Sequence, residues 1–217
     1  MAKRFNIRRL VWFVAIALVS VLFWLSPILA PFKIFVVFIH ETGHALATLL
    51  TGGRVLSMVV TPWQSGYVEP LGGNALIIAS AGYVGSALFG GIMLSLSGRK
   101  QWTQRIFTML AIVFGVVTLC FVRDFFGWIF GLGTAAMFSL LAYTRFPFSV
   151  YIVDILAVMS AMYALYDLSD FLWIGARTDA VILAGITGVP AFIWALVWSA
   201  ISLVLVYGAG KRALMRP

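Results

Sequence analysis

The chain contains only two histidines, and they stand four positions apart. His40 and His44 occur with Glu41 in the pentapeptide H-E-T-G-H. Because four residues make about one turn of an α-helix, both imidazoles leave the same helix face and can bind one cation. Zinc prefers neutral imidazole nitrogens in a tetrahedral arrangement. Glu41 lies about 100° around the helix from His40, where its carboxylate can reach a water molecule beside the metal rather than the metal itself.

This spacing is the H-E-x-x-H pattern that is typical of zinc peptidases. In that chemistry the glutamate takes a proton from water and passes it to the leaving amine. The pattern therefore predicts His40 and His44 as metal ligands and Glu41 as the catalytic base. The simpler alternative is that the three side chains form interhelical hydrogen bonds. The helix faces argue against it, because small or polar residues share the histidine side (Ala47, Thr48, Thr51) and bulky residues occupy the other (Phe35, Phe38, Leu46, Leu49).

Two histidines do not complete a catalytic zinc site, which needs three protein ligands and one open position. With a single cysteine, Cys120, the third ligand has to be a carboxylate. We predict Asp167, because it shares a helix face with small residues that suit a close helix contact. Asp170 and Asp154 remain alternatives, although Asp154 lies on roughly the opposite helix face from Asp167 and cannot serve the same ion. The other carboxylates are more simply explained as solvated or paired charges: Glu69, Asp124 and Asp179.

The composition indicates the solvent in which this site must work. Of the 217 residues, 63% are hydrophobic and only 10% are charged, against roughly a quarter in a soluble domain. The mean hydropathy is +1.06, so an integral membrane protein in contact with the lipid bilayer is expected. The net charge of +8 does not indicate a nucleic-acid partner, because the basic residues lie at the ends of apolar runs, as membrane anchors do.

The apolar runs predict an all-α polytopic membrane protein with six or seven transmembrane helices. The expected spans cover residues 10–30, 34–50, part of 70–98, 106–122, 125–144, 147–170 and 190–208. Residues 54–70 break this pattern with β-branched residues, a proline and aromatics, and predict a short β-hairpin-like segment after the catalytic helix. We expect a single integral membrane metallopeptidase domain over residues 1–217. The basic start favours a cytoplasmic N-terminus, but seven spans would then put the basic C-terminus outside.

Two segments resemble a known family. The sequence IHETGHALATLLTGG, followed by the strand-like region and then by ASAGYVGSALFGG, resembles the site-2 protease family of intramembrane zinc metalloproteases, in particular its small members without large soluble domains. The resemblance implies a zinc site inside a transmembrane helix, completed by an aspartate from a later helix. It also implies a transmembrane protein as substrate and a multi-pass location in a plasma membrane of the bacterial type.

The resemblance is strongest over residues 34–91 and has two departures. Tyr166, Asp167 and Leu168 stand where the family has a leucine–aspartate–glycine type motif, without the glycine. Gly82-Tyr83-Val84-Gly85 replaces the family's proline-and-asparagine pattern.

Two other classes of function remain open. A metal transporter would use the histidine pair, Asp154 and Asp167 as successive binding positions along the path of the ion. It would tolerate Glu41→Gln. A non-catalytic membrane scaffold with a vestigial or structural metal site would bind zinc without proteolysis. The sequence leaves the oligomeric state and the cleavage site undetermined.

Overall fold

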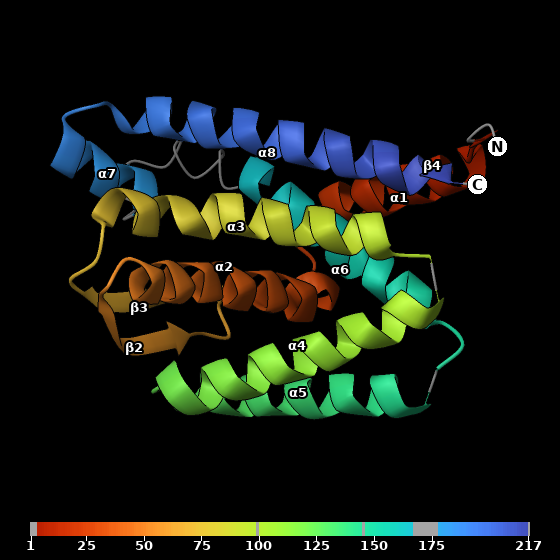
Figure 1. Ribbon diagram of the computed structural model, residues 1–217, viewed down its shortest axis with the longest axis horizontal. Coiled ribbons are helices and arrows are strands. Elements are labelled where there is room, and N and C mark those ends of the chain that lie inside the picture. The colour runs from red at the N-terminus through yellow and green to blue at the C-terminus, as the bar shows by residue number, and fades with distance from the viewer. Residues whose placement is uncertain (1–3, 99, 145, 167–177, 217) are drawn as a thin grey trace.

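The computed structural model describes residues 4–98, 100–144, 146–166 and 178–216 (Figure 1). Within these residues the chain forms eight α-helices, one short 3-10 helix and two two-stranded sheets. The helices are α1 (Ile7–Leu22), η1 (Pro27–Leu29), α2 (Ala30–Leu50), α3 (Ala75–Leu96), α4 (Lys100–Phe121), α5 (Phe125–Thr144), α6 (Ser149–Tyr166), α7 (Asp179–Thr187) and α8 (Ala191–Leu214). The strands are β1 (Arg4–Phe5), β2 (Arg54–Val60), β3 (Gly66–Leu71) and β4 (Met215–Arg216).

The predicted fold class is confirmed. Five helical segments are long and apolar enough to cross a membrane, over residues 27–50, 75–96, 101–121, 125–144 and 191–214. The apolar helices α1 and α6 are shorter, with 16 and 18 residues. The hairpin expected over residues 54–70 is also present, as the antiparallel strands β2 and β3.

The first span differs from the prediction of one helix over residues 10–30. Helix α1 ends at Leu22, and the chain turns before it enters η1 and α2. Ser26 has an extended backbone, because a residue that precedes proline is sterically excluded from the helical region. Its hydroxyl accepts a hydrogen bond from the Ile28 amide and caps η1. Because apolar residues stand on both sides of this break, a count of apolar residues along the sequence does not reveal it.

Helix α2 occupies the centre of the molecule, between α3 on one side and the α4–α5 pair on the other (Figure 1). Its α4-facing side inserts phenylalanines into a stacked aromatic core. The rings of Phe38 and Phe114 are parallel, with centroids 4.1 Å apart, and Phe138 meets Phe114 edge-on. Such contacts fix the rotation of α2 about its own axis. The opposite side of α2, which carries the histidines, is thereby held toward α3.

Close contact between α2 and α3 depends on glycine. A Cβ atom on Gly43 would lie 2.5 Å from the carbonyl oxygen of Ala81, so only a residue without a side chain permits this approach. The small residues that the sequence shows between residues 79 and 91 therefore lie where helices meet. Gly90 plays the same part against Ala157 and Ala161 of α6.

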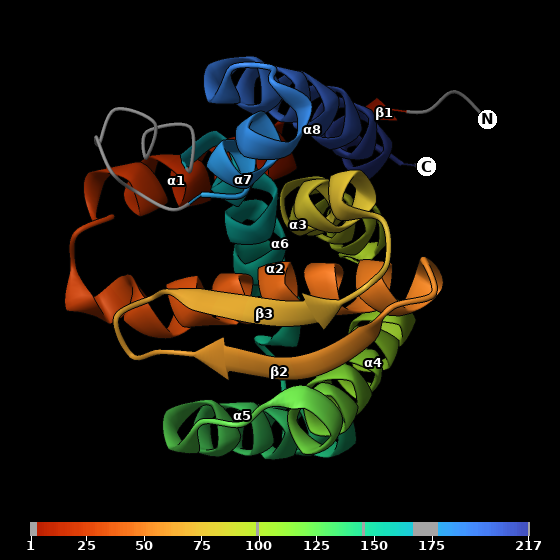
Figure 2. The same ribbon diagram turned by 90° about the vertical axis from the view of Figure 1, so that its left-hand side faces the viewer.

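The hairpin lies across one end of the helices and is attached to them at two places (Figure 2). At the α4–α5 junction, the Arg123 amide donates to the Met58 carbonyl at 3.0 Å. Asp124 accepts hydrogen bonds from the amides of Val60 in β2 and Gly127 in α5. At its base, the turn after α2 brings Gly53 against Gly72. At the other end of the molecule, β1 pairs with β4 and joins the beginning and the end of the described chain.

Candidate metal centre

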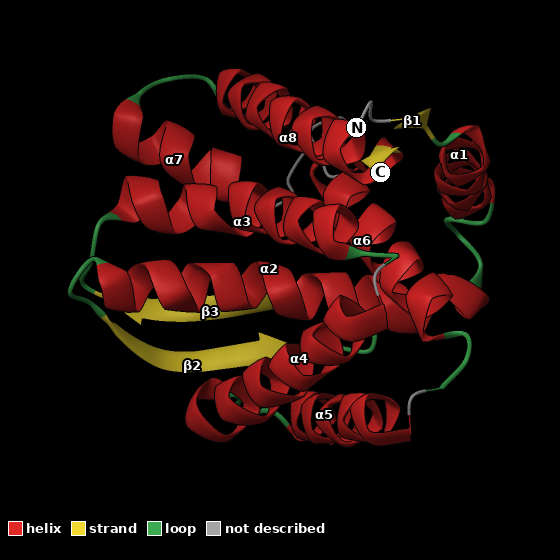
Figure 3. Ribbon diagram, turned by 45° about the vertical axis from the view of Figure 1, so that its right-hand side comes forward, coloured by secondary structure: helices red, strands yellow, loops and turns green. Residues whose placement is uncertain are grey.

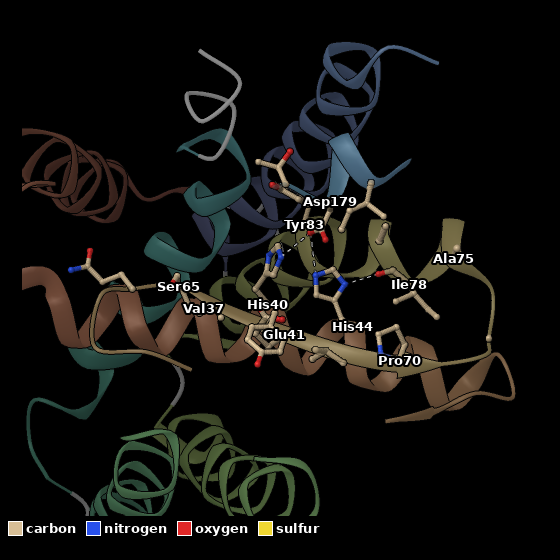
Figure 4. A pocket seen from close by; sticks show the side chains of 18 of the residues that line it. Val37, His40, Glu41, His44, Ser65, Pro70, Ala75, Ile78, Tyr83 and Asp179 are labelled. Atoms are coloured by element: carbon tan, nitrogen blue, oxygen red, sulfur yellow. Dashed lines mark hydrogen bonds and ion pairs between the residues drawn. The ribbon is translucent and has the colours of Figure 1, made fainter. Parts of the chain in front are cut away.

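The two histidines project from one face of α2, as their spacing predicts, and both imidazoles are almost completely buried (Figure 4). Their rings lie edge to face with centroids 4.7 Å apart. Nδ1 of His44 lies 2.6 Å from the carbonyl oxygen of Ile78 in α3. A carbonyl can only accept, so Nδ1 carries a proton, and Nε2 is the ring nitrogen that faces the site. The ring of His40 rests edge-on against Tyr83 of α3 at 5.0 Å.

A third candidate ligand atom comes from Asp179, at the start of α7. One of its carboxylate oxygens, Oδ2, lies 3.2 Å from Nε2 of His40 and 3.1 Å from Nε2 of His44. The side chain retains 19% of its surface exposed. Burial raises the pKa of the Asp179 carboxyl, but the hydrogen bonds and charges of the two histidines outweigh burial and hold that pKa below its ordinary value. The group is therefore an ionised acceptor.

Local sequence and packing together determine the position of Asp179. Thr178 caps α7 by accepting a hydrogen bond from the Val181 amide, and Gly188 ends the helix in the left-handed conformation at φ 71°. Ala180 and Leu183 anchor this short helix in a small apolar cluster with Tyr83 and Trp198, whose rings stack 4.8 Å apart. The same tyrosine therefore contacts both His40 and the cluster that holds α7.

The three ligand atoms suit a cation. The available nitrogen and oxygen ligand atoms of His40, His44 and Asp179 all lie within 4.8 Å of one another. The Asp179 carboxylate is an acceptor that lies 3.2 and 3.1 Å from the two Nε2 atoms, so each contact holds either a proton or a cation between its two groups. Space for an ion comes from Gly82, since a Cβ atom there would overlap Nε2 of both histidines, 2.5 Å from that of His44. Two imidazoles and one carboxylate are a donor set found in catalytic zinc sites, where the fourth coordination position stays open.

Glu41 borders the same cavity, which has a volume of about 530 Å³ and is closed on one side by β3. The side chain of Glu41 is 5% exposed. Its carboxylate lies next to the first residue of β3, because a Cβ atom on Gly66 would lie 3.0 Å from Oε1 of Glu41. The cavity also contacts Ser65, Tyr67 and Val68 of the hairpin, opposite Asp179 and Ile182 of α7. The cavity thus separates the strand from Asp179 of α7.

The structure does not place any other carboxylate that the sequence analysis considered as a ligand beside the two histidines, among the residues that it describes. The predicted ligand Asp167 and its alternative Asp170 lie outside the described residues. Asp154 belongs to α6 and lies beside the end of α3, where it accepts hydrogen bonds from Arg9, Trp12 and Ser97. Glu69 is exposed and accepts from Ser57 across the hairpin, and Asp124 holds the hairpin as described. Neither of these two carboxylates lies with the histidines, and each accepts hydrogen bonds from neutral donors.

Asp179 is the residue that the sequence analysis missed, since it was expected in a polar loop as a solvated or paired charge. It is instead the first residue of a helix. Thr178 directly before an apolar run is a recognisable helix start, and this signal would have moved Asp179 from a loop to a rigid element. Its distance from His40, 139 positions along the chain, is not readable from local pattern.

A family model described as Peptidase M50B-like matches residues 13–209. The chain belongs to this family. At the family level, the chain is therefore a membrane metalloprotease of the site-2 protease type. The match includes the helices that carry His40, His44 and Asp179, together with the hairpin. No curated protein and no solved structure gives a match.

Proposed function

We propose that this chain is an intramembrane zinc endopeptidase that hydrolyses peptide bonds in transmembrane segments of other proteins. The proposed location is a plasma membrane of the bacterial type. The observation that carries the proposal is the convergence of His40, His44 and Asp179 on one point beside a buried glutamate, in a cavity bordered by an exposed strand. A purely structural metal site would use four protein ligands and leave no open position.

His40, His44 and Asp179 are the proposed ligands of one zinc ion. Bound there, zinc supplies a Lewis acid that polarises the carbonyl of the scissile peptide and makes water a better nucleophile. The hydrogen bond from His44 Nδ1 to the Ile78 carbonyl fixes the ring orientation and keeps Nε2 available as a ligand. Tyr83 restricts His40 from the side. Asp167 stays a prediction from the sequence, and the experiment below separates it from Asp179.

Glu41 is the proposed general base. It follows His40 directly, so its carboxylate lies beside the histidine pair rather than between the two rings. From this position an oxygen of Glu41 accepts the proton of the attacking water and later donates it to the leaving amine. The low exposure of Glu41 keeps bulk water away from this transfer.

The hairpin is the proposed contact for the substrate. A peptide bond in a transmembrane helix is already hydrogen-bonded, so the helix must unwind before hydrolysis. Strand β3 pairs with β2 on one edge only, among the described strands. Its other edge can pair with an unwound segment by strand addition. Gly66 would then bring that segment next to Glu41, because nothing but backbone separates β3 from the carboxylate at this residue.

The first test compares Glu41→Gln with Glu69→Gln. The substrate is a reporter in which one apolar helix joins two soluble tags, inserted in the same vesicles as the purified protein. We expect Glu41→Gln to reduce cleavage by about 10²–10⁴-fold while zinc content and melting temperature stay as in the wild type. Glu69→Gln, an identical change on the exposed hairpin, keeps full activity. Cleavage by Glu41→Gln at the wild-type rate would overturn the proposal.

A second measurement identifies the ligands. Zinc content is determined for the wild type and for His44→Ala, Asp179→Ala and Asp167→Ala. We expect one zinc per chain in the wild type and in Asp167→Ala, and loss of zinc in the other two. Loss in Asp167→Ala with retention in Asp179→Ala would replace the proposed third ligand. Zinc in the wild type together with no cleavage by any form would favour the scaffold hypothesis.

A further inference from the structure

The two strands of the hairpin direct their backbone hydrogen bonds differently. In an antiparallel pair, residues alternately point their N–H and C=O groups toward the partner strand and away from it. The Thr61 amide donates to the Ser65 carbonyl at 2.8 Å, so this pair bonds across the hairpin. Counting by two along the register gives Tyr67 and Glu69 the same orientation. The residues of β3 that lie between these positions therefore direct their backbone groups away from β2.

The outer edge of β2 is bonded to the protein itself. Met58 and Val60 point away from β3 in the same register. The Met58 carbonyl accepts from the Arg123 amide, and the Val60 amide donates to Asp124, both at 3.0 Å. Figure 3 shows β2 beside α4 and β3 beside α2. The α4–α5 junction thus closes the outer edge of β2.

The outer edge of β3 consists of Gly66, Val68 and Pro70, and all three border the cavity of the candidate metal centre. No described backbone carbonyl outside the hairpin accepts from the amides of Gly66 and Val68. Figure 4 shows Glu41 between the labelled Ser65 and Pro70. This edge therefore runs past the proposed base.

The outer edge of β3 is limited at both ends. Pro70 has no N–H, so it accepts a hydrogen bond from an added strand but cannot donate one. Its place agrees with the rule that proline in a sheet directs its nitrogen away from the ladder. Before Gly66 the chain turns, with Gln64 in the left-handed conformation at φ 62°. The edge therefore offers two amides, those of Gly66 and Val68, and the carbonyls of all three edge residues.

We propose that the outer edge of β3 sets the length and the register of the substrate segment. An unwound stretch of roughly five residues, at about 3.3 Å each, pairs with this edge, and every second amide in it donates to the carbonyl of Gly66, Val68 or Pro70. Proline is consequently excluded from these substrate positions and accepted at the positions between them, whose amides face away from β3. This inference rests on the proposed function, because it describes the substrate of the same site.

A short edge suits a substrate that is taken from the bilayer. Each unwound residue loses its helical hydrogen bonds, and an unpaired backbone group is costly in hydrocarbon. The substrate carbonyl opposite Pro70 finds no donor on β3, so it gains nothing from leaving its own helix. Pairing with β3 and unwinding of the substrate therefore end at the same residue.

Backbone esters test the register without requiring catalysis. The cleavage site of the reporter is first mapped with the wild type. Short peptides that cover this site are then synthesised with one amide replaced by an ester, which removes a single N–H group. Their affinity is measured for zinc-loaded Glu41→Gln protein in detergent micelles, since this substitution leaves the edge of β3 unchanged.

We expect esters at three alternate positions to weaken binding by about two- to tenfold, which is the effect of one lost hydrogen bond. Esters at the positions between and beyond them should have no effect. Weakening at consecutive positions, or at none, would overturn the inference while the wild type still cleaves the reporter. If the wild type does not cleave the reporter, the proposed function fails, and this inference fails with it.

Pro70→Ala supplies the missing donor and tests where the edge ends. We expect the apparent KM for the reporter to fall by about two- to tenfold at unchanged kcat, because the new N–H forms one more hydrogen bond with the substrate. Pro62→Ala is the matched control, since the same change in the hairpin turn lies away from the cavity and should leave KM as in the wild type. An unchanged KM in Pro70→Ala would overturn the assignment of Pro70 as the end of the edge.

Discussion

Two aspartates in this protein, the buried Asp154 and the half-buried Asp179, meet nitrogen atoms of other helices in two different ways. At the Arg9–Asp154 cluster every contact pairs a donor with an acceptor, because Arg9 and Trp12 both donate to the Asp154 carboxylate. At the candidate metal centre, Asp179 faces two imidazole nitrogens, and each contact needs either a proton on the imidazole or a cation between the two groups. In the first cluster the Asp154 carboxylate is satisfied by side chains of the protein. The second cluster can be satisfied by a bound cation as well as by protons on the imidazoles.

The space around the two clusters differs in the same way. The guanidinium of Arg9 fills the place where a side chain at Gly98 would begin, so that glycine is needed for a contact within the protein. Gly82 leaves open the space in front of His40 and His44, next to a cavity of about 530 Å³. A buried charge alone therefore does not mark a functional site in a membrane protein. A carboxylate that meets two imidazoles beside a cavity is the stronger indication of one.

The largest effect is expected from filling that space. In Gly82→Ala the added methyl overlaps both ligand nitrogens and displaces them from the ion. We expect cleavage to fall by about 10²-fold or more, since a displacement of about 1 Å costs that much, together with loss of zinc from the purified protein. Gly85→Ala on the same helix is the matched control, because its nearest neighbour, Gly43 Cα, lies 3.9 Å away. Full zinc content in Gly82→Ala would show that the space does not hold the metal.

The Arg9–Asp154 cluster should respond in stability rather than in chemistry. Asp154→Ala leaves the Arg9 guanidinium without its carboxylate, and loss of one partner of a buried pair costs about 3–5 kcal/mol. We expect the free energy of unfolding in mixed micelles to fall by that amount, while the folded fraction still binds one zinc per chain. The double variant Arg9→Met/Asp154→Leu should recover most of the loss. If Asp154→Ala instead lost zinc at unchanged stability, the contrast between the two clusters would be wrong.

A smaller effect is expected at a third carboxylate, Asp124, which accepts two backbone amides and is only half-buried. Removing such a cap costs about 1–2 kcal/mol. Asp124→Ala should lower the melting temperature slightly and increase protease cutting within the hairpin, because the Val60 amide loses its partner. Ser57→Ala, on the exposed side of the same hairpin, provides the baseline. Equal cutting of both variants would mean that Asp124 does not hold the hairpin.

The sequence predicts those parts of the site that a single helix determines. His40, Glu41 and His44 belong to one helical turn, so their spacing alone predicts a shared face. The hairpin is also predictable, because β-branched residues and a turn interrupt an otherwise apolar chain. Asp179 is different, because its place depends on the docking of α7 against Tyr83 and Trp198, which are distant in sequence.

The break after Leu22 was missed for a related reason. Hydropathy averages over many residues, whereas the pair Ser26–Pro27 acts through backbone sterics at one position. Asp154 illustrates the same limit of the sequence analysis. Its sequence environment fits an ion-binding position of a transporter as well as a structural charge. Only the approach of Arg9, 145 positions away, distinguishes the two.

The contact of Gly43 with Ala81 has a mechanical consequence. Because the two backbones touch there, α2 and α3 cannot slide past each other without a steric clash. The two helices therefore form a rigid pair, and α2 of this pair carries His40, His44 and Glu41. A polypeptide that enters the cavity has to be accommodated by the walls built from side-chain contacts, namely the hairpin on one side and the nine-residue helix α7 on the other. The proposed metal ligands are thus divided between a rigid part, with both histidines, and a more readily displaced part, with Asp179.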